Sequence, residues 1–260
     1  MIQTKPIKIG IEIEGEFSQR AGDFGRKFGE MKGDGSISNC DDNEYKVNSK
    51  NFYHSVPNNL QRMEFASNVI DLVEAGEKRL PTYHNAVKIF KGLNSLYKKG
   101  HFHYNESCGF HIHLSFNRPK FPPELFSIEF CNYFYKRLKK HFPEVWNLRK
   151  NNRFCRPNNT EHEIANHDTE RYKGINLWAA REKHGTIEFR IFPSDEPLKM
   201  QKYLQFTLTT VKKFLAYGIE IKKEAELSDM DEPTIINYDD EEANIKETNA
   251  EFVESINLYV

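Results

Sequence analysis

The amino-acid sequence predicts an α+β fold with a mostly antiparallel sheet. Several segments alternate apolar and polar residues with the two-residue period of a half-buried strand. Longer segments between them carry the wider apolar spacing of amphipathic helices. Strands that are separated by loops and long helices in this way are typical of an α+β protein.

The N-terminal part of the chain is expected to hold two strands and two helices. In chain order, the expected segments are a strand at 8–17 (KIGIEIEGEF), polar loops at 18–59, a strand at 61–67 (QRMEFAS), a helix within 69–79 and a helix at 82–98. Asn68 is a suitable N-cap for the first helix, and Pro81 ends it. Gly100 follows the second helix, a common place for glycine.

The following part is expected to hold three strands and two helices. In chain order, these segments are a strand at 108–116 (CGFHIHLSF), a helix at 122–142 with proline at its start, a polar loop at 147–173, a hairpin of 174–180 with 185–193, and a long helix at 197–217. The tetrapeptide REKH at 181–184 is the expected hairpin turn.

Charge is unevenly distributed along the 260 residues. Residues 224–254 contain twelve acidic residues and one basic residue, Lys246, which leaves 26 acidic and 36 basic residues elsewhere. We therefore predict a catalytic domain at 1–223 and an acidic C-terminal tail at 224–260. The basic balance of the domain suits an anionic ligand such as a nucleotide or a nucleic acid. An ordinary basic surface with the acidic tail folded back on it explains the balance equally well.

Several observations bear on the compartment. No apolar run is long enough to span a membrane, and the N-terminus MIQTKPIKIG lacks the apolar core of a secretory signal. The four cysteines, Cys40, Cys108, Cys131 and Cys155, contain no CxxC pair. That spacing favours reduced thiols over a disulfide framework or a zinc cage. The sequence therefore predicts a cytoplasmic protein without a membrane partner.

The polar faces of the four clearest strands carry candidate ligands. Residues two apart on a strand share a face, so each strand has an apolar side and a polar side. The polar sides are rich in Glu, His and Arg, namely Glu12, Glu14 and Glu16, then Arg62 and Glu64, then His111, His113 and Ser115, and finally Glu188 and Arg190. A half-exposed sheet explains any one strand. The whole set would place like charges side by side, and these repel unless a cation offsets them.

The composition of this set favours a hard divalent ion. Several carboxylates with one or two imidazoles suit Mg²⁺ or Mn²⁺. A zinc site made of His111, His113 and Glu188 remains an alternative, because zinc prefers fewer and softer ligands than Mg²⁺ or Mn²⁺. Mg²⁺ held by carboxylates commonly completes its shell with phosphate oxygens, so a nucleotide is expected.

Arginines are the expected phosphate ligands. The chain has no GxxxxGK[ST] loop, so a nucleotide would have to bind through metals and guanidinium groups. Arg149, Arg153 and Arg156 in the polar segment and Arg190 on a strand are the candidates. For Arg149, an ordinary solvated loop charge is the favoured interpretation.

Six short blocks resemble the amidoligase family of carboxylate–amine ligases, relatives of glutamine synthetase and glutamate–cysteine ligase. The blocks are GIEIEGEF (10–17), GDGSIS (33–38), RMEFAS (62–67), CGFHIHLSF (108–116), GINLW (174–178) and TIEFRIFPSD (186–195). No single block is specific, whereas six in this order are fairly specific. They cover the chain sparsely to about residue 217.

The resemblance implies a fold, cofactors and roles for individual residues. The implied fold is the glutamine synthetase-like one, a curved sheet with the active site on its concave face and helices on its convex face. The implied cofactors are ATP and Mg²⁺ or Mn²⁺. The implied metal ligands are Glu12, Glu14, Glu64, His111 and Glu188. The implied nucleotide-binding residues are His111, His113 and Arg190, with Arg153 and Arg156 added from the polar segment. Arg190 and Glu64 are the implied catalytic residues, while Asp34, Ser36 and Asn176 are placed at the substrate end.

The implied reaction forms an amide at the expense of ATP. A substrate carboxylate becomes an acyl phosphate, and an amine then displaces phosphate, so the partners are small molecules or peptides that bear these groups. Three other functions fit the same residues. They are a phosphotransferase on the same kind of sheet, a zinc-dependent hydrolase, and a non-enzymatic nucleic-acid-binding protein that uses the basic body and its aromatic residues.

Overall fold

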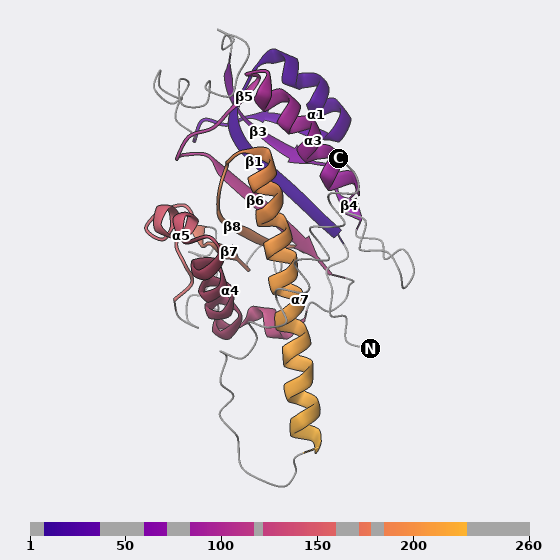
Figure 1. The fold of residues 1–260 in the computed structure, drawn as a ribbon, viewed down its shortest axis with the longest axis vertical. Helices are drawn as coiled ribbons and strands as arrows, with labels where there is room; N and C mark the ends of the chain where they lie inside the picture. The colour runs from indigo at the N-terminus through magenta and orange to yellow at the C-terminus, as the bar shows by residue number, and fades with distance from the viewer. Residues whose placement is uncertain are drawn as a thin grey trace. The chain divides into compact units, whose positions relative to one another are not determined.

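In the computed structural model, the described residues are 8–36, 60–71, 84–116, 122–159, 172–177 and 185–227. Eight strands within these ranges form one open sheet with the order β2-β3-β1-β6-β8-β7, and the short strands β4 and β5 both pair with β1 (Figure 1). The strands are β1 (Lys8–Phe17), β2 (Gly29–Gly33), β3 (Gln61–Ser67), β4 (Ile70–Asp71), β5 (Phe102–His103), β6 (Gly109–Ser115), β7 (Ile175–Asn176) and β8 (Ile187–Pro193). The strand pairs are antiparallel, which confirms the predicted α+β class with a mostly antiparallel sheet.

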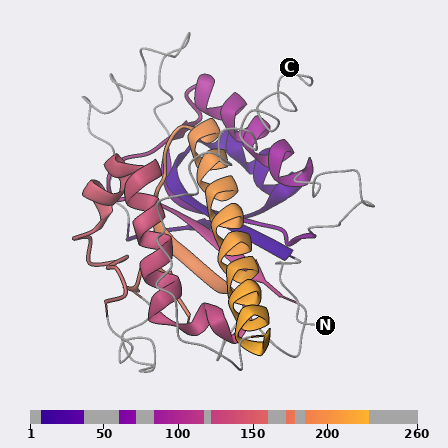
Figure 2. The ribbon, with the colours of Figure 1, turned by 60° about the horizontal axis from the view of Figure 1, so that its bottom comes forward.

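Helices cover one face of this sheet. The described helices are η1 (Gln19–Ala21), α1 (Gly22–Phe28), α3 (His84–Lys98), η2 (Pro123–Phe126), α4 (Ile128–His141), α5 (Pro143–Arg149) and α7 (Pro197–Leu227). Ring contacts join the layers, with centroids 6.0 Å apart for Phe90 and Phe110 and 4.9 Å apart for Phe134 and Phe189. Figure 2 shows α4 and α7 crossing the sheet next to each other. Burial of these aromatic rings is the main favourable term that holds the helices on the sheet.

The apolar sides of the strands face these helices. Ile9, Ile11 and Ile13 of β1 are each at most 1% exposed, and Phe110 and Ile112 of β6 are fully buried. Because side chains alternate along a strand, the intervening polar residues point to the opposite face of the sheet. The bounds of β1 and β3 agree with the sequence prediction to the residue.

The prediction of loops at 18–59 was wrong for part of the segment that the structure describes. Residues 18–36 are not only loop, because η1, α1 and β2 lie there, and α1 is held by Phe24, whose ring centroid lies 4.7 Å from that of Phe65. At the start of the expected helix within 69–79, Ile70–Asp71 form strand β4, which pairs with the first residues of β1, so the helix prediction does not hold for these two residues. Residues 37–59 and 72–79 lie outside the described ranges.

The second half follows the prediction more closely. The expected helix at 122–142 is divided into η2 and α4 at Ser127, whose Oγ accepts a hydrogen bond from the amide of Phe130 at 3.1 Å and caps α4. Helix α5 occupies the start of the predicted polar loop, and α7 extends beyond residue 217. Strands β7 and β8 pair as predicted, whereas residues 178–184 of the hairpin lie outside the described ranges.

The chain divides into two compact units, Met1–Ile219 and Glu220–Val260. In the second unit only the end of α7 is described, so the role of the acidic tail stays a prediction. Among the described residues, none of the helices has the length and apolar character needed to cross a membrane.

Candidate active site

The pairing of the strands gathers acidic and imidazole side chains on the sheet face opposite the helices. Glu12 of β1 is the register partner of His111 on β6, and His113 is the partner of Glu188 on β8. On the other side of β1, Glu14 pairs with Glu64 of β3. The four strands β3, β1, β6 and β8 are neighbours in this order, so their polar faces form one continuous surface.

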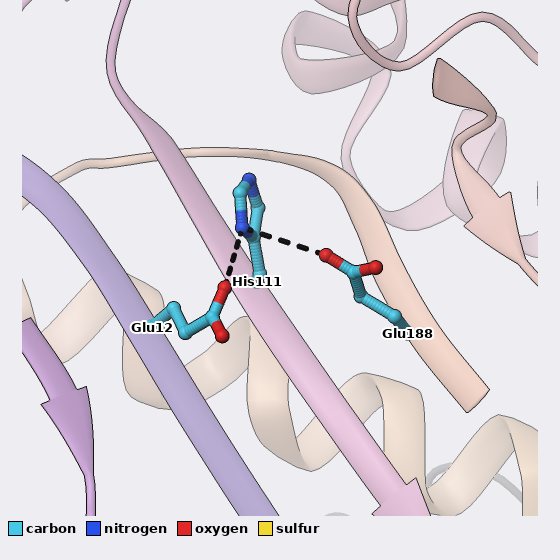
Figure 3. Close-up of side chains that lie close together, drawn as sticks. All are labelled: Glu12, His111 and Glu188. Atoms are coloured by element: carbon cyan, nitrogen blue, oxygen red, sulfur yellow. Dashed lines mark hydrogen bonds and ion pairs between the residues drawn. The ribbon is translucent and has the colours of Figure 1, made fainter. Parts of the chain in front are cut away.

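His111 lies at the centre of this surface. Its Nδ1 is 3.0 Å from Oε2 of Glu12 and 3.7 Å from Oε1 of Glu188, as Figure 3 shows. Its Nε2 is 3.6 Å from Oε1 of Glu14, on the opposite side of the ring. The His111 side chain is only 4% exposed, so these contacts lie largely out of bulk water.

His113 lies beside the same carboxylates, nearer the edge of the cluster. Its Nε2 is 3.2 Å from Oε1 of Glu12 and 4.0 Å from Oε1 of Glu188. That nitrogen is buried and lies within hydrogen-bonding distance of Glu12. Its Nδ1 lies 3.3 Å from the hydroxyl of Thr186.

Two groups of side chains have the geometry of a metal site. Glu12, His111 and Glu188 form one group, and Glu14, Glu64 and His111 form the other. In each group one ligand atom per residue lies within 4.8 Å of the others. A neutral imidazole has a single free lone pair, so His111 can be a ligand in only one group at a time. His113 belongs to neither of the two groups found among the described residues.

Glu188 is fixed by hydrogen bonds to both of its oxygens. Nη1 of Arg190 donates to Oε1 at 2.5 Å, and Nδ2 of Asn176 donates to Oε2 at 2.6 Å. The register between β6 and β8 shifts opposite His111, where two residues of β8 face one residue of β6. In a regular strand, Glu188, Arg190 and Phe192 would all point to the same face. Because of the bulge, Arg190 lies beside Glu188 while Phe192 points to the helix side and packs against Phe134.

Glu14 is fixed by a backbone group. The amide of Gly109 donates to its Oε2 at 2.6 Å. A Cβ atom added to Gly109 would lie 2.7 Å from Nε2 of His111 and 3.0 Å from Oε2 of Glu14. Glycine is therefore the residue that allows Glu14 and His111 to lie this close to the start of β6.

Burial and neighbouring charges divide the carboxylates into two kinds. For Glu12, burial opposes ionisation, but hydrogen bonds from His111 and His113 outweigh it and hold the pKa below its ordinary value. For Glu188, burial is likewise outweighed by the charge of Arg190, which lowers the pKa. For Glu64, burial and the charge of Glu12 outweigh the opposing charge of His111 and raise its pKa to about 7.

His113 is shifted in the direction that favours its charged form. Burial alone would lower its pKa, but the hydrogen bond and charge of Glu12 and the charge of Glu188 raise it. The pKa shifts of His113 and Glu64 both favour the protonated form, which opposes the excess of negative charge in the cluster. A bound divalent cation would take over this balancing role.

A family model described as "Putative amidoligase enzyme" matches residues 30–163, just over half of the chain. The chain belongs to the amidoligase family. No curated protein and no solved structure matches it. The matched span includes Glu64 and His111, whereas Glu12 precedes it and Glu188 follows it. Glu12 and Glu188 come next to the histidines of the matched span because β1 and β8 both pair with β6.

The predicted substrate residues of this amidoligase lie in two places. Asp34 and Ser36 follow β2, where Oδ1 of Asp34 accepts hydrogen bonds from the amide and the hydroxyl of Ser36, each at 2.7 Å. The amide of Asp34 donates to the carbonyl of Arg62 on β3 at 3.1 Å, and the charge of Asp34 contributes to the raised pKa of Glu64. Asn176 is buried, and its hydrogen bond orients the carboxylate of Glu188, which is a predicted metal ligand. Contact of these residues with a substrate stays a prediction.

The predicted phosphate-binding arginines of the polar segment are both exposed. The guanidinium of Arg153 lies over the ring of Phe154, 4.6 Å from its centroid. The carbonyl of Phe154 accepts a 3.5 Å hydrogen bond from Nε of Arg190, which brings this segment to the edge of the cluster. The backbone of Arg156 bridges to Lys173, two residues from β7.

Two site residues escaped the sequence analysis. Gly109 and Thr186 could have been noticed only by asking what adjoins the histidines of GFHIHLSF and the glutamate of TIEFR. The interpretation of Arg149 as a solvated loop charge was wrong, because it lies in α5 and is only 3% exposed. A helix with proline at its first position and glutamate in its first turn, PEVWNLR, was the available signal.

Proposed function

We propose that this amidoligase is an ATP-dependent ligase that uses Mg²⁺ or Mn²⁺ and joins a carboxylate to an amine through an acyl phosphate. The observation that supports it best is the pair of three-residue groups that share His111. Four carboxylates and one imidazole form a donor set that suits hard divalent ions better than zinc. The arrangement also supports a glutamine synthetase-like fold, since the acidic face lies opposite the helix-covered face.

The residues present fit a metal-bound triphosphate. Glu12, Glu14, Glu64, His111 and Glu188 would hold the ions, which would neutralise the charge of the phosphate oxygens. His113, whose Nε2 lies 3.2 Å from Oε1 of Glu12, would stand beside the bound triphosphate at the edge of the cluster. Arg190 keeps N–H groups beyond those that bind Glu188 and Phe154, and these can donate to phosphate.

In the first half of the proposed reaction, an oxygen of the substrate carboxylate attacks the γ-phosphorus of ATP. The bond from that phosphorus to the ADP oxygen breaks, so the products are an acyl phosphate and ADP. Arg190 is positioned by Glu188 to stabilise the charge that develops on the transferred phosphoryl group. None of these steps requires a protein nucleophile. The thiols of Cys108 and Cys155, both with pKa values raised by burial, are poor candidates for one.

In the second half, the nitrogen of an amine attacks the acyl carbon. The carbon–oxygen bond to phosphate breaks, inorganic phosphate leaves, and the nitrogen must lose a proton. Glu64 is the proposed acceptor, because its pKa of about 7 matches proton exchange near neutral pH. Asp34, whose charge adds to the raised pKa of Glu64, would attract a positively charged amine.

The test is the fate of the carboxylate oxygen. We would screen pools of acids and amines for Mg²⁺-dependent ADP release, with Glu12→Gln and Glu188→Gln as inactive controls. The active acid would then be labelled with ¹⁸O. The proposal predicts one ¹⁸O in the released phosphate for each amide formed, because the carboxylate oxygen passes through the acyl phosphate.

Other outcomes would contradict the proposal. A phosphorylated product without phosphate release would make the protein a phosphotransferase. Stoichiometric zinc in the purified protein, together with substrate hydrolysis in the absence of ATP, would make it a hydrolase. Binding of nucleic acid with steep salt dependence, and no ADP release, would make it a binding protein.

A further inference from the structure

Arg149 is a buried cation that the proposed reaction does not use. It is the last residue of α5, a helix that packs against β8, and it is only 3% exposed. Arginine is rarely buried to this extent unless its guanidinium is paired with an anion. The partners of this side chain therefore need to be accounted for.

The partners that the structure provides are neutral and few. Nη1 donates to the backbone carbonyl of Glu106 at 3.3 Å, which is near the limit of a hydrogen bond. Nε is buried and has no hydrogen-bond partner. In the described part of the chain, none of the ion pairs involves Arg149.

A neighbouring thiol does not supply a negative charge either. The thiol of Cys155 interacts with Arg149, but burial raises the pKa of that thiol despite the neighbouring guanidinium. The thiol therefore stays neutral at physiological pH and is a weak acceptor. An uncompensated charge in a buried position is costly, so the protein lowers its free energy when an anion binds there.

Hydrogen bonds connect Arg149 to two segments that hold residues of the candidate active site. Its Nη1 donates to the carbonyl of Glu106, which lies in the loop before Gly109, and the amide of Gly109 donates to Glu14. Its backbone carbonyl accepts from the thiol of Cys155 at 3.8 Å, and the carbonyl of the preceding residue, Phe154, accepts from Nε of Arg190. Arg149 is thus tied to the segments that hold Glu14 and Arg190.

We infer that Arg149 is the core of a phosphate-binding subsite at the end of the active site that carries Glu14 and Arg190. The planar guanidinium can donate two parallel hydrogen bonds to one phosphate group. The Nε atom without a partner supplies one of these donors. The inference rests on the proposed function only for the source of the phosphate, which would be a triphosphate chain bound beside the metal ligands.

The test uses inorganic tripolyphosphate as the probe, which has no base, sugar or reactive partner. We would measure its dissociation constant by calorimetry for the wild-type protein, Arg149→Met and Arg26→Met. Arg26 is an exposed arginine of α1 that pairs with Asp23, so its substitution makes the same change in net charge away from the site. Melting temperatures without ligand would be recorded for all three proteins.

For Arg149→Met we expect weaker tripolyphosphate binding together with a higher melting temperature. Arg149→Met weakens tripolyphosphate binding at least tenfold but raises the melting temperature of the ligand-free protein, because methionine fills the buried site without a charge. Arg26→Met changes neither quantity. A purely structural arginine predicts the opposite pattern, a lower melting temperature with unchanged tripolyphosphate affinity, and that result would overturn the inference.

Two further measurements separate this inference from the proposed ligase reaction. Mn²⁺ affinity in the absence of phosphate is expected to be the same in Arg149→Met and the wild type, since Arg149 is not among the metal ligands. If Arg149→Met loses tripolyphosphate binding while no acid and amine release ADP, the phosphate subsite stands and the ligase reaction falls. If the wild type binds no tripolyphosphate, the subsite is disproved whatever the reaction.

Discussion

Glu64 offers the sharpest prediction. As a proposed metal ligand it contributes to function, but in the metal-free protein its negative charge lowers the free energy of unfolding. Burial and the charge of Glu12 raise its pKa from an ordinary 4.5 to about 7. A difference of this size corresponds to roughly 3 kcal/mol of unfavourable free energy once the carboxylate is ionised. Glu64 is only partly buried, so solvent screening reduces this to about 1–2 kcal/mol.

The pH dependence has a definite sign. Below pH 4.5 the carboxyl group is protonated in both the folded and the unfolded chain, so it has no effect on stability. Between 4.5 and about 7 the unfolded chain loses the proton first, so stability falls as pH rises, and above 7 the cost is constant. Glu64→Gln is therefore expected to raise the free energy of unfolding by about 1–2 kcal/mol at pH 8 and by nothing at pH 4.

The assay is urea unfolding in EDTA at both pH values, followed by the same measurement with Mn²⁺. Glu30→Gln is the matched control, because Glu30 is an exposed glutamate of β2 paired with Lys32. With Mn²⁺ the order should reverse, since the wild type gains the free energy of metal binding and Glu64→Gln gains less. A variant that is less stable than the wild type in EDTA at pH 8, or equally stable at both pH values, would refute the reasoning.

Three other substitutions test the supports of the site. Gly109→Ala places a Cβ atom 2.7 Å from Nε2 of His111, and we expect a loss of about 1–3 kcal/mol in stability together with weaker Mn²⁺ binding; calorimetry showing unchanged Mn²⁺ affinity would count against it. Asn176→Leu removes the donor to Oε2 of Glu188 and should weaken Mn²⁺ binding by roughly 10–100-fold; an unaltered titration would show that Glu188 needs no such support. Ser127→Ala removes the cap of α4 and should cost about 1 kcal/mol in urea unfolding while leaving Mn²⁺ binding as in the wild type; a loss of metal binding would mean that α4 shapes the site directly.

The sequence predicted best what depends on local alternation. In β1, isoleucine and glutamate alternate so regularly that both the strand and its two faces could be read from residues 8–17. The same holds for His111 and His113 of β6, which share the acidic face as predicted. The sequence predicted that Glu12, His111 and Glu188 come together, but not which of them are direct neighbours. Strand order and register decide that, and they are set by contacts between residues far apart in the chain.

Tertiary packing decided the elements that the sequence analysis missed. The segment GDFGRKF contains two glycines and has low helix propensity, yet it forms α1 because Phe24 packs between Phe28 and Phe65. Residues Ile70–Asp71 belong to a strand because β1 extends far enough to pair with them. The bulge in β8 interrupts strict alternation, and only the partner strand reveals it.

Burial of charge was the second kind of feature that the sequence could not provide. Arg149 and Arg153 lie in the same polar stretch of the sequence, but Arg149 is buried, whereas the guanidinium of Arg153 lies over the exposed ring of Phe154. Which carboxylate keeps its proton is likewise a matter of neighbours. Glu12 faces two imidazoles, whereas Glu64 faces other carboxylates.

The most direct measurement of the central claim is a Mn²⁺ titration followed by electron paramagnetic resonance. It would compare the wild type, Glu12→Gln and the exposed control Glu30→Gln, each with and without ATP. The account predicts that the wild type and Glu30→Gln bind Mn²⁺ more tightly when ATP is present, and that Glu12→Gln loses at least tenfold in affinity. Equal Mn²⁺ affinity in Glu12→Gln and the wild type would contradict it, because Glu12 would then lie in an acidic cluster that holds no metal.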